Sequence, residues 1–135
     1  MKELTVKAVV ENIPRVTAFL EEELERANCP MKAIMQIGLA VDELFGNIAN
    51  YAYPDGAGSA TVRLEIDKAA REASLTFIDE GVPYDPLAKE DPDVTLSAEE
   101  RQIGGLGIFL VKKTMDGMRY ERRDGKNHLT ITKKY

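Results

Sequence analysis

Three polar side chains at helical spacing in the stretch Ala40–Tyr53 are the first candidates for chemistry. Glu43, Asn47 and Asn50 are four and three residues apart, so they share one side of an α-helix. An apolar stripe of the same helix can pack against a sheet: Val41, Leu44, Ile48 and Ala52. Half-buried polar groups are costly without a partner, and a magnesium ion on a phosphate chain would be one. The alternative is that the three polar side chains face solvent.

A second candidate is Asp79, at the end of a predicted strand, with Gly81 two residues later. The neighbours of Asp79 are apolar, so its carboxylate needs hydrogen-bond donors, and the amino group of adenine is one. Gly81 has no side chain, so a flat base could lie close to the backbone there. The alternative is that Asp-x-Gly is only a turn that ends the strand.

The third candidate is the glycine run Gly104–Gly107, which begins a predicted helix. Backbone N–H groups at a helix start attract anions, so the run favours phosphate binding. It is neither a Walker A loop nor a Rossmann fingerprint, because no Gly-Lys-Ser/Thr follows and no strand precedes it. Arg101, just before it, could pair with a terminal phosphate. Close packing of the glycines and simple solvation of Arg101 are the alternatives.

Other kinds of chemistry find little support in the sequence. His128 is the only histidine and falls in a predicted strand, so phosphohistidine or metal chemistry on it is not expected. The sequence has no Cys/His cluster for zinc and no nucleophile elbow. Cys29 is the only cysteine, so no internal disulfide can form, and we assign it no role. These features predict a cytoplasmic protein.

Composition excludes further classes of protein. The 135 residues are 44% hydrophobic and 30% charged, as in a globular domain, and no apolar run is long enough to span a membrane. The polar N-terminus does not resemble a signal peptide. Residues 1–111 hold 10 basic and 20 acidic side chains, and residues 112–135 hold 8 and 3. This basic tail has no aromatic pattern for nucleic acid, so we expect a solvated sheet face or a patch for an acidic protein.

Hydrophobic periodicity predicts the elements that position these candidates. Strands are predicted at Leu4–Val10, Ala60–Ile66, Ala73–Asp79, Gly117–Arg123 and Asn127–Lys133. Helices are predicted at Ile13–Ala27, Pro30–Ala52 and Ile103–Asp116. We expect Asn12 to cap the first helix and Leu106, Phe109, Leu110 and Met115 to form the buried face of the third.

The order of these elements predicts an α+β fold. The expected architecture is a two-layer α/β sandwich, with a mixed, mostly antiparallel sheet covered on one face by three helices. The acidic segment Leu87–Gln102 is long for a loop and is interpreted as a lid. Neither a linker nor an internal repeat interrupts the chain, so residues 1–135 are expected to form one domain.

The ordered set of motifs resembles the GHKL ATPase and kinase superfamily, which has the Bergerat nucleotide-binding fold. Glu43–Tyr53 is similar to its N-box, Asp79–Pro86 to its adenine-binding box, and Gly104–Gly107 to the glycine box at its lid hinge. The spelling DEGVPYDP and the one-domain length resemble the stand-alone anti-sigma factor serine/threonine kinases of the RsbW and SpoIIAB kind. Tyr51 departs from the superfamily, where many members have histidine.

The resemblance implies ATP and Mg²⁺ as cofactors, with roles for single residues. Asn47 would be the magnesium ligand, and Glu43 would be the general base that prepares an attacking hydroxyl. Asp79 would accept from the adenine amino group while Gly81 lets the base approach. Thr130, in the last strand, would lie near adenine.

The remaining nucleotide contacts are expected around the phosphates. Gly105 and Gly107 would lie beside them, and Gly104, Asn50 and Arg101 complete the predicted nucleotide-binding set.

The implied activity is an ATP-dependent serine/threonine protein kinase. Its implied partners are a STAS-type anti-anti-sigma protein, which it phosphorylates, and a sigma factor, which it sequesters. The alternative is a catalytically inactive ATP-binding module that only binds protein partners. A homodimer is expected, and direct contact with nucleic acid or a membrane is not.

Overall fold

The computed structural model describes residues 1–88 and 106–135. The strands are β1 (Lys2–Lys7), β2 (Ser59–Asp67), β3 (Glu72–Asp79), β4 (Gly117–Arg123) and β5 (Lys126–Lys134). The α-helices are α1 (Ile13–Arg26), α2 (Met31–Asn47) and α3 (Leu106–Thr114). Shorter helical turns lie at Val10–Asn12, Ile48–Ala52 and Pro86–Ala88.

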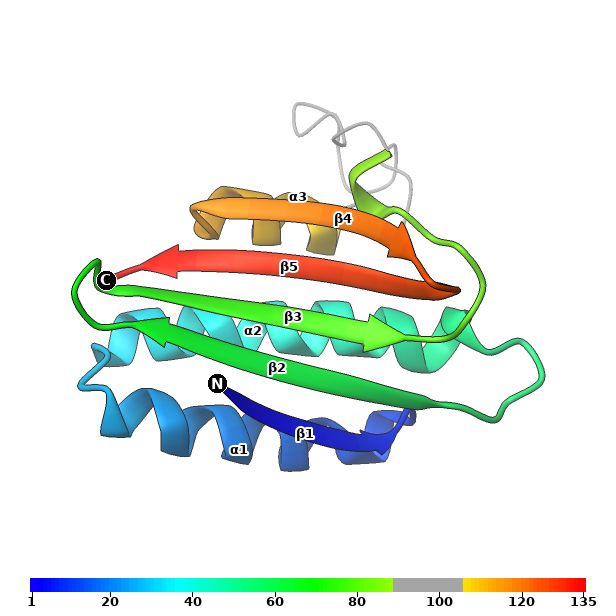
Figure 1. Ribbon diagram of the computed structural model, residues 1–135, viewed down its shortest axis with the longest axis horizontal. Coiled ribbons are helices and arrows are strands. Elements are labelled where there is room, and N and C mark those ends of the chain that lie inside the picture. The colour runs from blue at the N-terminus through cyan, green and yellow to red at the C-terminus, as the bar shows by residue number, and fades with distance from the viewer. Residues whose placement is uncertain (89–105) are drawn as a thin grey trace.

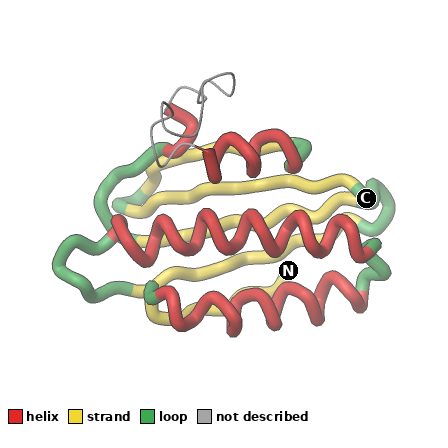
Figure 2. The backbone as a smooth tube through the Cα atoms, turned by 180° about the vertical axis from the view of Figure 1, so that it is seen from behind, coloured by secondary structure: helices red, strands yellow, loops and turns green. Residues whose placement is uncertain are grey.

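The strands form a five-stranded sheet in the order β1-β2-β3-β5-β4. Each neighbouring pair is antiparallel, so the expected parallel component is not found in the described sheet. All three helices lie behind the sheet in Figure 1, and Figure 2 shows α2 between α1 and α3. The α+β prediction, a two-layer sandwich with helices on one face, is confirmed.

Alternation along the strands separates a buried face of the sheet from a polar one. The buried face packs against the helices, and its side chains include Val62, Leu64, Leu75, Phe77, Leu129 and Ile131. The other face is turned toward the viewer in Figure 1. We call it the open face, and its central side chains are those of Arg63, Thr76, Thr130 and Arg119. Neighbouring residues of one strand therefore serve opposite sides of the molecule.

The predicted apolar stripe of α2 is buried over its full length. Val41 and Leu44 are at most 1% exposed, and Ile48 and Ala52 follow in a π-helical turn. The predicted helix Pro30–Ala52 thus changes pitch after Asn47 rather than continuing as an α-helix. π-Helical turns of this kind are frequent at functional sites.

The N-terminal boundary differs from the prediction. β1 ends at Lys7, and a 3₁₀ turn at Val10–Asn12 precedes α1. The predicted capping role of Asn12 is wrong, because its backbone is already helical and its Nδ2 donates to the Lys7 carbonyl, 2.9 Å away, instead of capping the helix. Pro14 lies in the first turn of α1 as expected.

The buried face of the third helix was predicted only in part. Leu106 and Leu110 are 40% and 53% exposed, whereas Ile108, Val111 and Met115 are buried. Most residues of this segment are apolar, so periodicity could not select the inner face. No helix in residues 1–88 or 106–135 is long and apolar enough to cross a membrane.

The closing hairpin follows its sequence signal. Asp124 and Gly125 have φ angles of 55° and 74°, the left-handed pair that a type I′ turn requires. This turn fixes the register of β4 and β5, and β3 then pairs with β5 so that Asp79 lies opposite Asn127.

Candidate functional site

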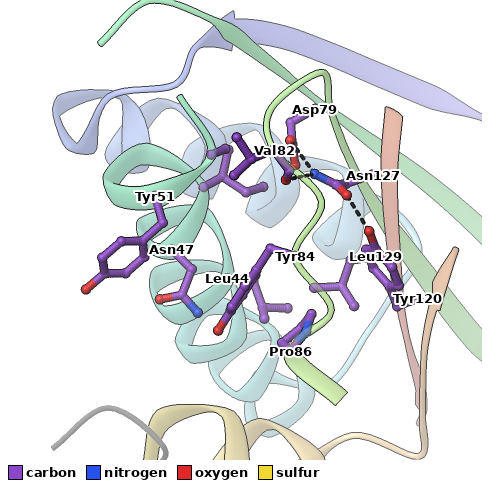
Figure 3. A pocket seen from close by; sticks show the side chains of 12 residues that line it. Leu44, Asn47, Tyr51, Asp79, Val82, Tyr84, Pro86, Tyr120, Asn127 and Leu129 are labelled. Carbon is purple, nitrogen blue, oxygen red and sulfur yellow. Dashed lines mark hydrogen bonds between the residues drawn. The ribbon is translucent and has the colours of Figure 1, made fainter. Parts of the chain in front are cut away.

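A pocket lies between the C-terminal end of α2 and the sheet, and Figure 3 shows its side chains. Most of its lining is apolar or aromatic: Leu44, Ile48, Tyr51, Ala52, Val82, Tyr84, Pro86, Tyr120 and Leu129. Three side chains supply carboxylate or amide groups: Asn47, Asp79 and Asn127. An apolar pocket with a few convergent polar groups is the usual form of a small-molecule site. The structure therefore brings together two residues singled out in the sequence, Asn47 and Asp79.

Asp79 is held in place by two donors. Its side chain is buried, and Oδ1 accepts from the Gly81 backbone N–H and from Asn127 Nδ2, each at 2.9 Å. Its second oxygen, Oδ2, makes no hydrogen bond to the described residues. This oxygen is free to accept a hydrogen bond, so a ligand with a donor in the pocket could pair with it.

Asn127 is a site residue that the sequence analysis missed. Its Nδ2 donates to Asp79 Oδ1 and to the Val82 carbonyl, both at 2.9 Å, and its Oδ1 accepts a hydrogen bond from the Tyr120 hydroxyl. Antiparallel pairing of the last strand with β3 places the Asn127 amide opposite the Asp79 carboxylate, so a prediction of that pairing would have identified Asn127. Asn127 thus fixes both Asp79 and the loop after it.

We expect Asn127→Ala to destabilise the fold by about 2–3 kcal/mol, because three hydrogen bonds are lost and their buried partners remain. For this chain length that corresponds to a melting temperature lower by roughly 10 °C, measurable by calorimetry. Tyr120→Phe, which removes only one of the three bonds, is the matched control and should lose less than half as much. Equal melting temperatures for Asn127→Ala and the parent would show that the network adds no net stability.

Gly81 is required by the packing of the backbone. A Cβ at this position would overlap the carbonyl of Ala52, at the end of the π-helical turn. The Val82 N–H donates to the same carbonyl at 2.8 Å, and Arg122 Nη1 donates to the Gly81 carbonyl at 2.8 Å. The sequence analysis assigned Gly81 to close approach of a base, whereas the structure supplies a reason within the chain itself.

Tyr53 joins three segments around the pocket. Its hydroxyl donates to the Ser59 carbonyl at 2.6 Å and accepts from the Glu80 N–H at 2.8 Å. Burial raises the pKa of the phenol, so it stays neutral and keeps its proton for Ser59. The end of the helical segment, the start of β2 and the end of β3 are therefore tied at one point.

The polar stripe predicted on α2 is only partly present. Asn47 points into the pocket from the last turn of α2 (Figure 3). Glu43 is half-buried one turn earlier, and Asn50 is exposed and does not line the pocket. The change of pitch after Asn47 rotates Asn50 away from the α-helical stripe.

Glu43 lies against the start of α3. A Cβ built on Gly107 would overlap the Glu43 carboxyl group, so that group occupies the space a side chain would fill. Gly107 was predicted to lie beside phosphates. In the structure its nearest neighbour is the carboxylate of Glu43, one helical turn before Asn47. α2 and α3 are thus in contact at the candidate base.

Gly107→Ala is expected to move the Glu43 carboxylate while leaving the fold intact. The displaced group is the end of a flexible side chain, and alanine is the better helix former, so the melting temperature should be unchanged or slightly higher. Phosphotransfer, if Glu43 serves it, should fall about tenfold or more. Gly38→Ala in α2, where nothing lies within 4 Å of a new Cβ, is the control. An unchanged rate would show that the carboxylate position does not matter.

Thr130 is not brought to the pocket. It is buried on the open face, and its hydroxyl pairs with that of Thr76 at 2.9 Å. Its strand neighbours Leu129 and Asn127 line the pocket instead. The predicted site residues Arg101, Gly104 and Gly105, and all but the first two residues of the predicted lid, lie outside the described residues.

The comparison with known families matches this geometry. The histidine kinase-like ATPase domain matches residues 6–133, nearly the whole chain. The chain belongs to the histidine kinase-like ATPase family. The resemblance based on the three motifs is thereby confirmed at the level of the family. Asp79 and Asn47, which the motifs singled out, line the same pocket.

Two curated relatives are similar to this histidine kinase-like ATPase domain. The serine/threonine-protein kinase BtrW of Bordetella bronchiseptica is 38% identical over 94 residues, which are 70% of this chain and 66% of BtrW. The anti-sigma F factor of Clostridium acetobutylicum is 26% identical over 95% of this chain and 87% of that protein. The chain thus spans slightly less than two thirds of BtrW.

A solved structure supports the fold alone. The crystal structure of the RsbU and RsbW domains of a Mycobacterium tuberculosis protein matches 99% of this chain and 32% of that chain. The TM-score is 0.64 and the sequence identity is 16%.

The pocket residues fit a nucleotide with its metal. Asp79 Oδ2 offers an acceptor without a partner, and the apolar and aromatic lining suits a base. No group of three or more His, Cys, Asp and Glu residues in the described ranges could hold a metal ion. A magnesium ion here would therefore rely on the Asn47 amide oxygen together with the phosphates, as this ion commonly does.

Proposed function

We propose that this protein is a cytoplasmic, ATP-dependent serine/threonine protein kinase and anti-sigma regulator, formed by a single domain of residues 1–135. The observation that carries the proposal is Asp79, a buried residue that lines an apolar pocket together with Asn47 and has one carboxylate oxygen fixed by two donors and the other without a partner among the described residues. The names of the relatives, a serine/threonine-protein kinase and an anti-sigma factor, support the same assignment.

The proposed chemistry divides among three residues. Asp79 accepts the adenine amino group, and Asn47 holds the ion. Mg²⁺, when bound, neutralises phosphate charge and orients the terminal phosphoryl group. Glu43, half-buried one helical turn from Asn47, takes the proton of the attacking serine hydroxyl as the serine oxygen bonds to the γ-phosphorus of ATP; the bond from that phosphorus to the β–γ bridging oxygen breaks, and ADP leaves.

The proposed substrate is a STAS-type anti-anti-sigma protein, and the second partner is a sigma factor. Both assignments rest on the resemblance and on the anti-sigma relative. A homodimer is part of the same proposal, and a monomeric mass in light scattering at high concentration would contradict it.

The deciding experiment incubates the protein with Mg-ATP and a STAS protein from the same genome, followed by intact-mass spectrometry. A gain of one phosphoryl group on the STAS protein, absent when its acceptor serine is alanine, supports a kinase. Nucleotide release with no gain of mass would indicate an ATPase. Nucleotide-dependent binding of the unmodified STAS protein, without turnover, would favour the inactive partner-binding module.

A further inference from the structure

A second site, separate from the nucleotide pocket, lies on the open face of the sheet. A polar groove there is lined by Arg63, Glu65, Ser74, Thr76, Arg119, Glu121, Arg123, His128 and Thr130. No helix covers this side of the sheet among the described residues, as Figures 1 and 2 agree. None of these residues except Thr130 entered the argument about the nucleotide.

The residues at the centre of the groove lie next to one another across four neighbouring strands. Arg63, Thr76, Thr130 and Arg119 are register partners on β2, β3, β5 and β4 in turn. Neighbouring strands are about 4.8 Å apart, so the two arginine backbones are about 14 Å apart with the threonines between them. Arg63 Nη2 contacts Glu3 on β1, on the outer side of β2, so the guanidinium group of Arg63 would turn inward to meet a small ion over the threonines, as that of Arg119 would from β4.

Some hydrogen-bond donors of these four side chains have no acceptor among the described residues. Arg63 Nε is buried and has no hydrogen-bond partner among the described residues. The other end of its guanidinium group makes only a long, 3.4 Å bond to Glu3 at a partly exposed position, and such pairs contribute little. Arg119 makes no hydrogen bond or ion pair with the described residues. One hydroxyl proton of the Thr76–Thr130 pair is also free to donate, because the pair uses only one.

The surrounding charges favour an anion of limited size. Burial first, and then the cation Arg123, lower the pKa of His128, while Glu121 opposes them. The lining holds three arginines and two glutamates, so the groove has a small excess of positive charge. Glu121 lies 3.7 Å from Arg123, and Glu65 is exposed at the edge of the groove. These two carboxylates would repel an extended polyanion and leave room for a compact one.

We infer that the open face holds a binding site for a small oxyanion, phosphate or carboxylate, clamped between Arg63 and Arg119 over the Thr76–Thr130 hydroxyls. Planar guanidinium groups bind such oxygens in pairs, and charge-assisted bonds of this kind are the strong ones. Of the residues first assigned to ATP the site uses only Thr130, which does not line the nucleotide pocket, so the site can exist whether or not the protein is a kinase.

The test is a ¹H–¹⁵N NMR titration of the full chain with inorganic phosphate at constant ionic strength, with acetate and chloride as parallel arms. Saturable shifts are expected at the amides around Arg63, Thr76 and Arg119 and at the Arg63 Nε–H signal. The ring signal of His128, the single histidine, should report a higher pKa when the anion is bound. Tighter binding in the phosphate or the acetate arm identifies the preferred oxyanion.

The variants separate the site from general charge effects. Arg119→Gln, at an exposed position without described partners, should fold normally and bind the anion about tenfold more weakly or worse. Arg63→Gln should do the same, and Lys68→Gln, an equal change of charge at an exposed turn, should have no effect. Shifts that are linear in phosphate, equal in chloride, or unchanged by both arginine variants would overturn the inference.

Discussion

Glu43→Gln should bind ATP within about twofold of the parent and lose 10²–10⁴-fold in phosphotransfer, the range for a lost general base. Glutamine keeps the size and most packing of glutamate, and Glu43 does not line the pocket that would hold the base of the nucleotide. Its carboxylate lies at the contact between α2 and Gly107, where an amide can stay but cannot take a proton. The variant should therefore keep its affinity for ATP and lose phosphotransfer.

The measurement is single-turnover transfer to the STAS protein, with ATP affinity measured by calorimetry on the same preparation. Asp42→Asn is the control, because it changes an exposed carboxylate on the same helix. Transfer by Glu43→Gln at the parental rate would remove Glu43 from the mechanism. Loss of ATP affinity instead would assign Glu43 to binding.

Asp79→Asn should weaken ATP binding about 100-fold or more. The Gly81 N–H and Asn127 Nδ2 both require an oxygen at the inner position, so the amide NH₂ of the variant must face the pocket. It would then present a donor to the adenine amino group, which is also a donor, and such mismatches are heavily penalised.

A thermal melt detects this change. Nucleotide at about 100 times its dissociation constant should stabilise the parent by about 2.7 kcal/mol, or roughly 10 °C, and a 100-fold weaker variant by only about 0.4 kcal/mol. Asp55→Asn, at an exposed loop position, should behave as the parent. ITP has a carbonyl in place of the adenine amino group and should partly restore binding to Asp79→Asn. An undiminished shift with ATP would place adenine elsewhere.

The sequence was sufficient for the layers of the fold and for two of the residues that meet at the pocket, Asn47 and Asp79. Alternation located the strands, because each has one face on the core and one in water. The helical period located the buried stripe of α2 and placed Asn47 beside it. The ordered motifs then identified the family, although each motif alone had an ordinary structural explanation.

The differences between the predicted and the described positions have physical causes. Alternation shows that a strand has two faces but not which face meets a ligand, so Thr130 was selected where Asn127 contacts Asp79. The π-helical turn after Asn47 removed Asn50 from the stripe, and a helical wheel assumes constant pitch. The capping prediction for Asn12 failed because a carbonyl of the preceding strand competes for its side chain.

Alternate residues of β5 line two different surfaces, and this limits which insertions and deletions the hairpin can accept. Asn127 and Leu129 line the nucleotide pocket, while His128 and Thr130 line the open face. Substitutions affect one surface at a time. Deletion or insertion of a single codon near the Asp124–Gly125 turn would exchange the two sets and remove both surfaces together. A library of variants in this hairpin should therefore tolerate many changes of residue type but few changes of length by one.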